Sequence, residues 1–411
     1  MALLTRRNAR RLSAVCSALG ALVITSATLA PEAAALDVQS KEWYLDAMGA
    51  KDIWKISTGK GVKVAVIDSG VNPATLSLKG QVLVDEVPKS VAYHVTHDNI
   101  GHGTSMAEII AGTGAGGGIK GLAPDAKIIP FRIASAVSDN DEIGKTPDEA
   151  EAIRAAADSD AKIINMSFGA YEPNDAMEAA LKYAASKGKL MFVSIGNEGD
   201  KGNMPSYPAV YPYAVGVAAL DKSGTVGEFS SYGGYVDLAA PGLNIPSWCD
   251  GKFNEYCDSQ GTSPASAIAS ASAALIWSAH PDWTGNQVLR TLIDTAARDW
   301  AKDKPSKYLG YGGVRPRRVL INKNINPGPA DVDPLAKENG DGTSPSPSSS
   351  AKDPSGKPTK DAGSAGGPTS AAAKDTDSGS GGQTWVIIGA VAAVLVIGGA
   401  GFAVLRARRN S

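Results

Sequence analysis

The chain lacks a surplus of basic charge. Its 40 lysines and arginines are balanced by 42 acidic residues, which gives a net charge of −2. Nucleic-acid binding depends on cationic side chains that contact phosphates, so no nucleic acid is expected as a partner. The chain also lacks an internal repeat, and its 43% hydrophobic content excludes a wholly disordered or collagen-like protein. The sequence therefore predicts one large globular domain or two smaller ones.

Cysteine is scarce, with three residues in 411. Cys16 lies in a segment that is predicted to be removed, which leaves Cys249 and Cys257. In an oxidising compartment this pair favours one disulfide, with two buried free thiols as the alternative. A zinc site at the pair is less favoured, because no histidine lies near it. The chain has no apparent calcium-loop motif, so neither a metal nor a cofactor is expected.

The N-terminus has the pattern of a secretory signal peptide over residues 1–35. The arginine-rich stretch TRRNARR (5–11) precedes an apolar run over 12–30, and the alanines at 33–35 offer a cleavage site. The mature chain is therefore expected to begin near Leu36. A buried N-terminal helix is the alternative, and the arginine pairs do not decide between the Sec and twin-arginine routes of export.

The C-terminal part has the pattern of a membrane anchor. Residues 326–384 are rich in Pro, Ser and Gly and predict a disordered linker. The 21 uncharged residues Trp385–Leu405 would span about 31 Å as a helix, which matches the hydrocarbon core of a bilayer. The arginines in the tail 406–411 predict a cytoplasmic C-terminus, with the preceding domain outside the cell membrane. A cleaved sorting tail is the alternative, but the linker lacks an LPxTG-type signal.

The body of the chain alternates apolar, β-branched runs with helical stretches. Expected strands cover residues 62–67, 126–133, 161–167, 190–195 and 214–219, and expected helices include 146–159 and 174–187. Several of the runs are continuously apolar, as in strands that are buried on both faces of a parallel sheet. The predicted fold class is therefore α/β, with a mostly parallel central sheet flanked by helices.

Four chemically active residues lie in loops or at helix starts within this pattern. Asp68 and Asn197 follow expected strands, His102 lies in a Gly-His-Gly loop, and Ser263 opens an apolar helix. Taken singly, each has an ordinary explanation as a loop cap, a turn or an N-cap. Together an acid, an imidazole, a hydroxyl and an amide form the set that acyl transfer requires.

The motifs around these residues resemble those of the subtilisin-like serine proteases. The segments are VAVIDSGV (64–71), GHGT (101–104), INMSFG (164–169), SIGNEG (194–199), FSSYG (229–233), DLAAPG (237–242) and GTSPAS (261–266). Within that family, the order of an N-terminal extension (36–61), a peptidase domain (62–325), a linker and a membrane helix resembles the mycosins. Those are actinobacterial proteases associated with type VII secretion.

The resemblance implies a membrane-anchored, extracytoplasmic serine endopeptidase. Ser263 would be the nucleophile, His102 the general base and Asp68 the residue that orients the imidazole. The Asn197 amide would donate to the oxyanion together with the backbone N–H of Ser263. A type VII secretion complex in the membrane is the implied partner. The alternative from another class is a subtilisin-like scaffold that supports such a complex without proteolysis.

The resemblance further implies two substrate-binding segments. Ser167, Phe168 and Gly169 would form an edge on which a polypeptide substrate pairs as an extended strand. Ser194, Ile195 and Gly196 would line an uncharged specificity pocket.

The sequence departs from the family's pattern at Pro264 and Ser105, and the former puts the tilt of Ser263 in doubt. A nucleotide-binding module on the Gly114–Gly118 run is excluded, because no strand immediately precedes the run and no P-loop lysine follows it. The large apolar side chains within residues 37–60 predict that the N-terminal extension packs on the domain.

Overall fold

The structure, a computed structural model, describes residues 36–137 and 140–339. Its centre is a six-stranded sheet in the order β2-β1-β3-β4-β5-β6, and every neighbouring pair in it is parallel. The strands are β1 (Lys63–Asp68), β2 (Lys127–Arg132), β3 (Ile163–Met166), β4 (Leu190–Ser194), β5 (Ala214–Leu220) and β6 (Leu238–Pro241). The predicted α/β class with a mostly parallel sheet is confirmed.

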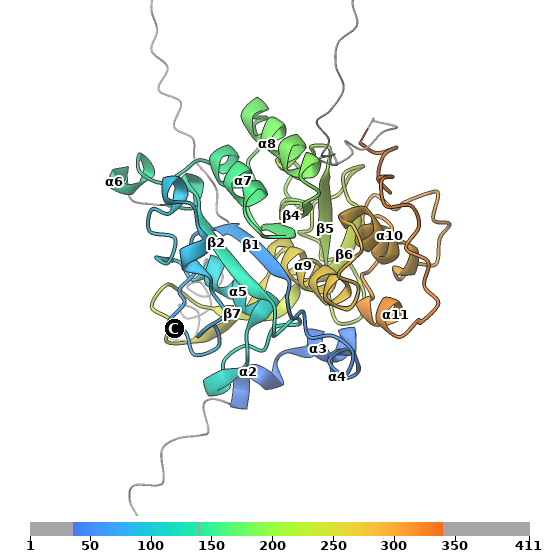
Figure 1. Ribbon diagram of the computed structural model, residues 1–411, viewed down its shortest axis with the longest axis horizontal. Coiled ribbons are helices and arrows are strands. Elements are labelled where there is room, and N and C mark those ends of the chain that lie inside the picture. Colours follow the sequence, from blue (N-terminus) through green and yellow to red (C-terminus); the bar gives the residue numbers. More distant parts are fainter. Residues whose placement is uncertain (1–35, 138–139, 340–411) are drawn as a thin grey trace, which may run out of the picture.

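Helices cover both faces of the sheet (Figure 1). On one face lie α5 (His102–Ala111), α9 (Thr262–Ala279) and α10 (Gly285–Thr295), and on the other lie α7 (Glu149–Asp158) and α8 (Asp175–Ser186). Each face carries a hydrophobic core: the first core lies between the sheet and α5, α9 and α10, and the second lies between the sheet and α7 and α8. Alternate residues of β1 point into the two cores, with Val64 in the first and Ala65 in the second. Both faces of the strand are therefore buried, which explains its continuous apolar sequence.

The remaining elements are short. They are α2 (Leu36–Ser40), α3 (Trp43–Met48), α4 (Ala50–Ile53), α6 (Asn140–Ile143), α11 (Pro316–Leu320), the antiparallel hairpin β7 (Leu243–Trp248) and β8 (Tyr256–Gln260), and the 3₁₀ turns η1 (Val84–Glu86), η2 (Lys89–Val91), η3 (Ala115–Gly117) and η4 (Ala134–Ala136).

The N-terminal extension packs on the α5 and α9 side of the sheet, as its apolar residues predicted. Tyr44 and Ile53 are fully buried there. The Tyr44 hydroxyl donates to the Lys120 carbonyl at 2.9 Å, and the Trp54 indole N–H donates to the Leu122 carbonyl at 2.9 Å. These bonds satisfy the polar groups of two large side chains, of which Tyr44 is buried in the core and Trp54 packs against it.

The ordered structure continues beyond residue 325, where the sequence predicted that a disordered linker begins. Leu335 is buried against the first core. The Arg290 guanidinium donates to the carbonyls of Pro327 and Pro329 at 3.2 and 2.8 Å. The sequence predicted a linker here because residues 326–339 are mostly small or polar. Composition alone does not reveal these specific contacts.

Several predicted segments lie outside the described residues. They are the signal peptide (1–35), the part of the linker after residue 339, the membrane helix (385–405) and the tail (406–411). Among the helices of the described residues, none has both the length and the hydrophobicity to cross a membrane.

Candidate active site

Asp68 and His102 form a hydrogen-bonded pair at the carboxyl end of the sheet. Asp68 is the last residue of β1 and is 3% exposed, while His102 is the first residue of α5. Nδ1 of His102 lies 2.7 Å from Oδ1 of Asp68. The same carboxylate oxygen accepts the backbone N–H of Ser69 at 2.7 Å. These bonds fix the imidazole with Nδ1 toward the acid and leave Nε2 for other chemistry.

Two glycines flank His102 and permit this approach. Gly101 has a φ of 78°, and a Cβ there would lie 2.7 Å from the Asp250 carbonyl oxygen. A Cβ on Gly103 would lie 2.2 Å from the carbonyl oxygen of Gly70 and 2.9 Å from Cβ of Asp68. Only glycine allows the first turn of α5 to lie this close to the end of β1.

The charges around His102 favour its protonated form. Burial lowers the pKa of His102, but the charge and hydrogen bond of Asp68 and the charge of Asp98 outweigh burial and raise the pKa above the usual value. An imidazolium that forms here during a reaction is therefore stabilised.

Asp98 organises the loop before His102, and sequence reasoning did not single it out. This carboxylate is 3% exposed. Its Oδ1 accepts the backbone N–H of Gly101 at 2.8 Å and the Ser69 hydroxyl at 2.9 Å. Its Oδ2 accepts the backbone N–H and the hydroxyl of Thr104 at 2.9 and 2.7 Å. A buried carboxylate with so many donors holds both sides of His102 in place.

Ser263 is the second residue of α9 and is partly exposed. Its hydroxyl donates to the carbonyl of Ser167 at 3.3 Å. In the register of β1 and β3, Ile67 pairs with Met166, so Asp68 and Ser167 follow at the same level on adjacent strands. Neighbouring strands lie about 4.8 Å apart. Ser263 is thus attached to the strand end next to the Asp68–His102 pair, although its hydroxyl does not bond to His102 here.

Asn165 holds the start of α9 against β3, and sequence reasoning also missed it. It is fully buried in an otherwise apolar strand. Its side-chain oxygen Oδ1 accepts hydrogen bonds from the hydroxyls of Ser266 and Ser270 at 3.0 and 3.1 Å. Its side-chain NH₂ group donates to the Ser167 hydroxyl at 3.0 Å. The lone amide within IINM and the i, i+4 serines of α9 are the signals that could have revealed this connection.

Pro264 is accommodated as the third residue of α9.

Asn197 is held beside Ser263 by the intervening Thr262. The backbone N–H of Thr262 donates to Oδ1 of Asn197 at 2.9 Å, and the Thr262 hydroxyl donates to the same oxygen at 3.2 Å. Because the carbonyl end of the amide is occupied by two donors, its NH₂ group points away from Thr262. A Cβ on Gly261 would lie 3.5 Å from Nδ2, which places the NH₂ group at the start of α9.

The two predicted substrate-binding segments lie side by side, because one follows β3 and the other begins at Ser194, the last residue of the neighbouring strand β4. The Ser194 hydroxyl donates to the Phe168 carbonyl at 3.4 Å. A Cβ on Gly169 would meet the Ser206 hydroxyl. Ile195 is fully buried in the second core, so it has no exposed surface with which to line the expected pocket.

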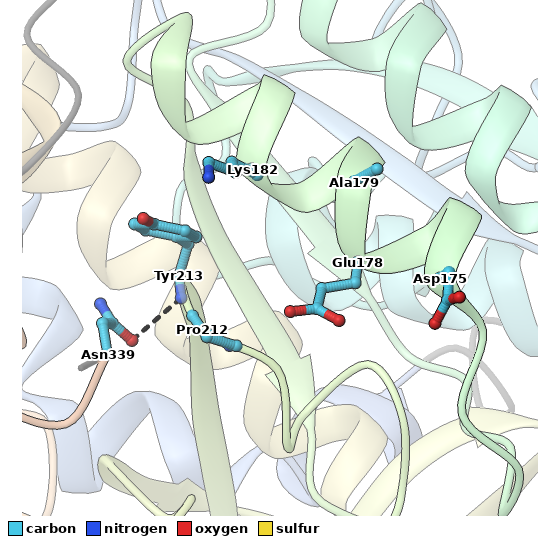
Figure 2. Close-up of a pocket in the computed structure, with 7 residues that line it drawn as sticks. All are labelled: Asp175, Glu178, Ala179, Lys182, Pro212, Tyr213 and Asn339. Atoms are coloured by element: carbon cyan, nitrogen blue, oxygen red, sulfur yellow. Dashed lines mark hydrogen bonds between the residues drawn. The ribbon is translucent and has the colours of Figure 1, made fainter. Parts of the chain in front are cut away.

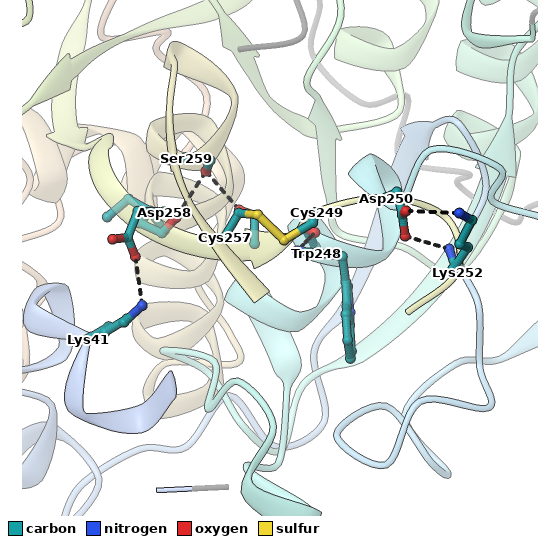
Figure 3. The surroundings of a disulfide bond; sticks show 11 residues. Lys41, Trp248, Cys249, Asp250, Lys252, Cys257, Asp258 and Ser259 are labelled. Atoms are coloured by element: carbon teal, nitrogen blue, oxygen red, sulfur yellow. Dashed lines mark hydrogen bonds and ion pairs between the residues drawn. A yellow bond between two sulfur atoms is a disulfide. The ribbon is translucent and has the colours of Figure 1, made fainter. Parts of the chain in front are cut away.

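The predicted disulfide joins Cys249 to Cys257 across the β7–β8 hairpin (Figure 3). The hairpin touches the loop before His102, since a Cβ on Gly251 would lie 2.2 Å from the Asn99 carbonyl oxygen. The backbone N–H of Trp248 donates to the Ser105 hydroxyl in α5 at 2.9 Å. The disulfide therefore closes a hairpin that supports His102 and continues directly into α9.

A surface hollow lies elsewhere, between α8 and the segment before β5 (Figure 2). It is lined by Asp175, Glu178, Ala179, Lys182, Pro212, Tyr213 and Asn339. None of these residues belongs to the predicted site, and charged side chains line much of the hollow.

Known proteins are similar to this chain in sequence and in fold. The model of the subtilase family matches residues 59–312. A thermostable alkaline protease of Halalkalibacterium halodurans is 34% identical over 240 residues, which cover 58% of this chain and 63% of that protein. The chain thus spans less than two thirds of that relative.

Two solved structures are also similar. The crystal structure of MycP1 from Mycobacterium smegmatis has a TM-score of 0.56 and 26% identity, and the match covers 74% of this chain and 89% of that one. The MycP3 protease from the type VII (ESX-3) secretion system has a TM-score of 0.55 and 28% identity, with 71% and 90% covered.

Proposed function

Because the chain belongs to the subtilase family of serine endopeptidases, we propose that it hydrolyses peptide bonds with Ser263 as the nucleophile, His102 as the general base and Asp68 as its orienting acid. The observation that carries this proposal is the 2.7 Å bond between His102 and Asp68 beside the strand end that holds Ser263.

The proton transfers follow from this arrangement. A rotation about χ1 of Ser263 directs its hydroxyl from the Ser167 carbonyl to Nε2 of His102. The imidazole takes the proton as Oγ attacks the substrate carbonyl carbon, and later gives the proton to the leaving amine. Asp68 stabilises the imidazolium through Nδ1–H and stays ionised throughout.

The developing oxyanion would be stabilised by two donors. One is the NH₂ group of Asn197, which Thr262 orients by occupying the carbonyl end of the same amide. The other is the backbone N–H of Ser263, which lies in the first turn of α9 and has no intrahelical acceptor there. The substrate would pair as an extended strand with the Ser167–Gly169 segment.

Labelling with a fluorophosphonate tests the proposal, because the reagent requires an activated serine. The purified chain is expected to be labelled and to cleave peptides, and the Ser263→Ala variant to do neither. Ser278→Ala is the matched control, because Ser278 lies at the other end of the same helix. Labelling that persists in Ser263→Ala would overturn the assignment.

We further propose that the enzyme is anchored in the cell membrane through Trp385–Leu405 and acts with a type VII secretion complex. The hydropathy of that segment and the likeness to MycP1 and MycP3 support this. Fractionation of cells that express the full chain or a chain ending at residue 384 tests the anchor. A truncated chain that stays with the membrane would contradict it.

A further inference from the structure

Three side chains that commonly bind metals meet at the surface, outside the candidate active site. His94 and His97 lie in the loop before α5, and Glu142 lies in α6 at the periphery, near the edge strand β2 (Figure 1). Oε1 of Glu142 is 2.9 Å from Nδ1 of His94 and 4.0 Å from Nδ1 of His97. The three ligand atoms all lie within 4.8 Å of one another.

We propose that His94, His97 and Glu142 form a binding site for a divalent transition-metal ion, with Zn²⁺ as the best match. Tetrahedral zinc with ligands at about 2.0–2.1 Å requires ligand atoms about 3.3 Å apart. The separations in this cluster bracket that value, so small side-chain rotations bring the ligands into place. Two imidazoles and a carboxylate favour zinc over magnesium or calcium, which prefer oxygen ligands.

Access to the cluster is open on one side. The side chains of His94 and His97 are 50% and 57% exposed, so an ion can enter from solvent and keep a water molecule as its fourth ligand. Glu142 is more enclosed, with a side chain 13% exposed. The site thus has one enclosed ligand, Glu142, and two exposed histidines that can adjust their positions.

Arg132 holds Glu142 in place from the interior of the protein. It is 1% exposed at the end of β2, and its Nη2 lies 2.7 Å from Oε2 of Glu142. This bond occupies Oε2 and leaves Oε1 facing the histidines. Residues that bond to metal ligands commonly orient them in this way. The positive charge of Arg132 also repels a dication, so it should weaken binding of the ion.

An ion in this site would connect two parts of the chain that are far apart in sequence. His97 directly precedes Asp98, the carboxylate that holds the loop before His102. A bond from zinc to both His97 and Glu142 would tie this loop to α6. Zinc is therefore expected to raise the thermal midpoint of the folded chain.

The test uses the full chain with Ser263→Ala, treated with EDTA and then titrated with ZnCl₂ by calorimetry. One ion per chain is expected, with binding weakened by more than about tenfold in His94→Gln and in His97→Gln. His280→Gln is the matched control, because His280 stacks on Trp283 at 3.8 Å and lies outside the cluster. The thermal midpoint is expected to rise with zinc in the parent chain and not in His97→Gln.

Three results would overturn the site: no saturable binding, binding unchanged in both His94→Gln and His97→Gln, or binding lost only in His102→Gln. The last would place the ion on the Asp68–His102 pair instead. The histidine variants are preferred to Glu142→Gln, because that change leaves the buried Arg132 without its carboxylate. Since every chain in the test carries Ser263→Ala, the outcome does not depend on the proposed peptidase activity.

Discussion

Replacing Asp98 with asparagine would test whether this buried carboxylate positions His102. Its Oδ1 accepts donors from Ser69, Ile100 and Gly101, and its Oδ2 accepts two donors from Thr104. Asparagine keeps one acceptor oxygen but replaces the other with an NH₂ group, which is itself a donor. In the better of its two orientations, Asp98→Asn preserves the bonds at Oδ1 and loses both bonds to Thr104.

The size of the effect follows from those two bonds. A hydrogen bond to a charged group contributes about 1.5–3 kcal/mol, so the loss of two such bonds should lower the free energy of unfolding by about 3–6 kcal/mol. The charge of Asp98 also contributes to the raised pKa of His102. Because His102 must be neutral to act as the proposed general base, a lower pKa of His102 should move the acid limb of kcat/KM to lower pH.

Two measurements separate positioning from mere destabilisation. Urea unfolding of Asp98→Asn in a Ser263→Ala background gives the loss of stability, and the pH profile of active Asp98→Asn gives the shift of the acid limb. Asp237→Asn is the matched control, because burial raises the pKa of Asp237 to about 8 and asparagine resembles its neutral form. Asp237 precedes β6, at the opposite side of the sheet from β2. An unshifted acid limb, or stability equal to that of the parent, would refute the reasoning.

Three further predictions concern neighbouring parts of the structure. Asn197→Ala should lower kcat by about 10²–10³, the loss that removing this donor causes in a subtilisin, and a full rate would exclude the oxyanion role. Replacing Cys249 and Cys257 with serine should lower the free energy of unfolding by roughly 2–3 kcal/mol. It should also lower activity, because the hairpin supports the His102 loop, and an unchanged kcat would show that this support is dispensable. Burial raises the pKa of Glu42 from 4.5 to about 8, so the stability it contributes is complete below about pH 4.5 and is lost as pH rises through 8. Hydrogen exchange in residues 36–53 should therefore increase between pH 7 and 9 in the parent and less in Glu42→Gln, and equal increases would contradict this.

The central strands could be predicted because each is a short apolar run buried on both faces. The expected strand over 190–195 matches β4 (Leu190–Ser194), and the run over 214–219 matches β5 (Ala214–Leu220). The hairpin strand β8 was missed, because YCDSQ is polar and largely exposed and so carries no apolar signal. Its structure comes from pairing with β7 and from the disulfide.

The candidate site was predictable only where a residue lies in a recognisable motif. Asp68 and His102 were singled out in this way, and the structure brings them into contact. Asn165 bonds to serines of another helix, and Asp98 bonds to Ser69, 29 residues away, as well as to its own loop, so no single segment of the sequence shows the full set of their partners. The same holds for Glu142, which lies 48 residues from His94 in the sequence and is brought to it by the fold.

The departure from the family pattern at Ser105 has a structural explanation that connects the hairpin to the site. Ser105 is 1% exposed, and its hydroxyl donates to the Gly101 carbonyl at 2.6 Å while it accepts the Trp248 N–H at 2.9 Å. A serine hydroxyl is short enough to make both bonds within one helical turn. The residue thus joins the turn before His102 to the last residue of β7, one position before Cys249. Because β8 then continues into the helix of Ser263, a single disulfide-closed hairpin links the proposed base to the proposed nucleophile, and its integrity should affect the geometry of both.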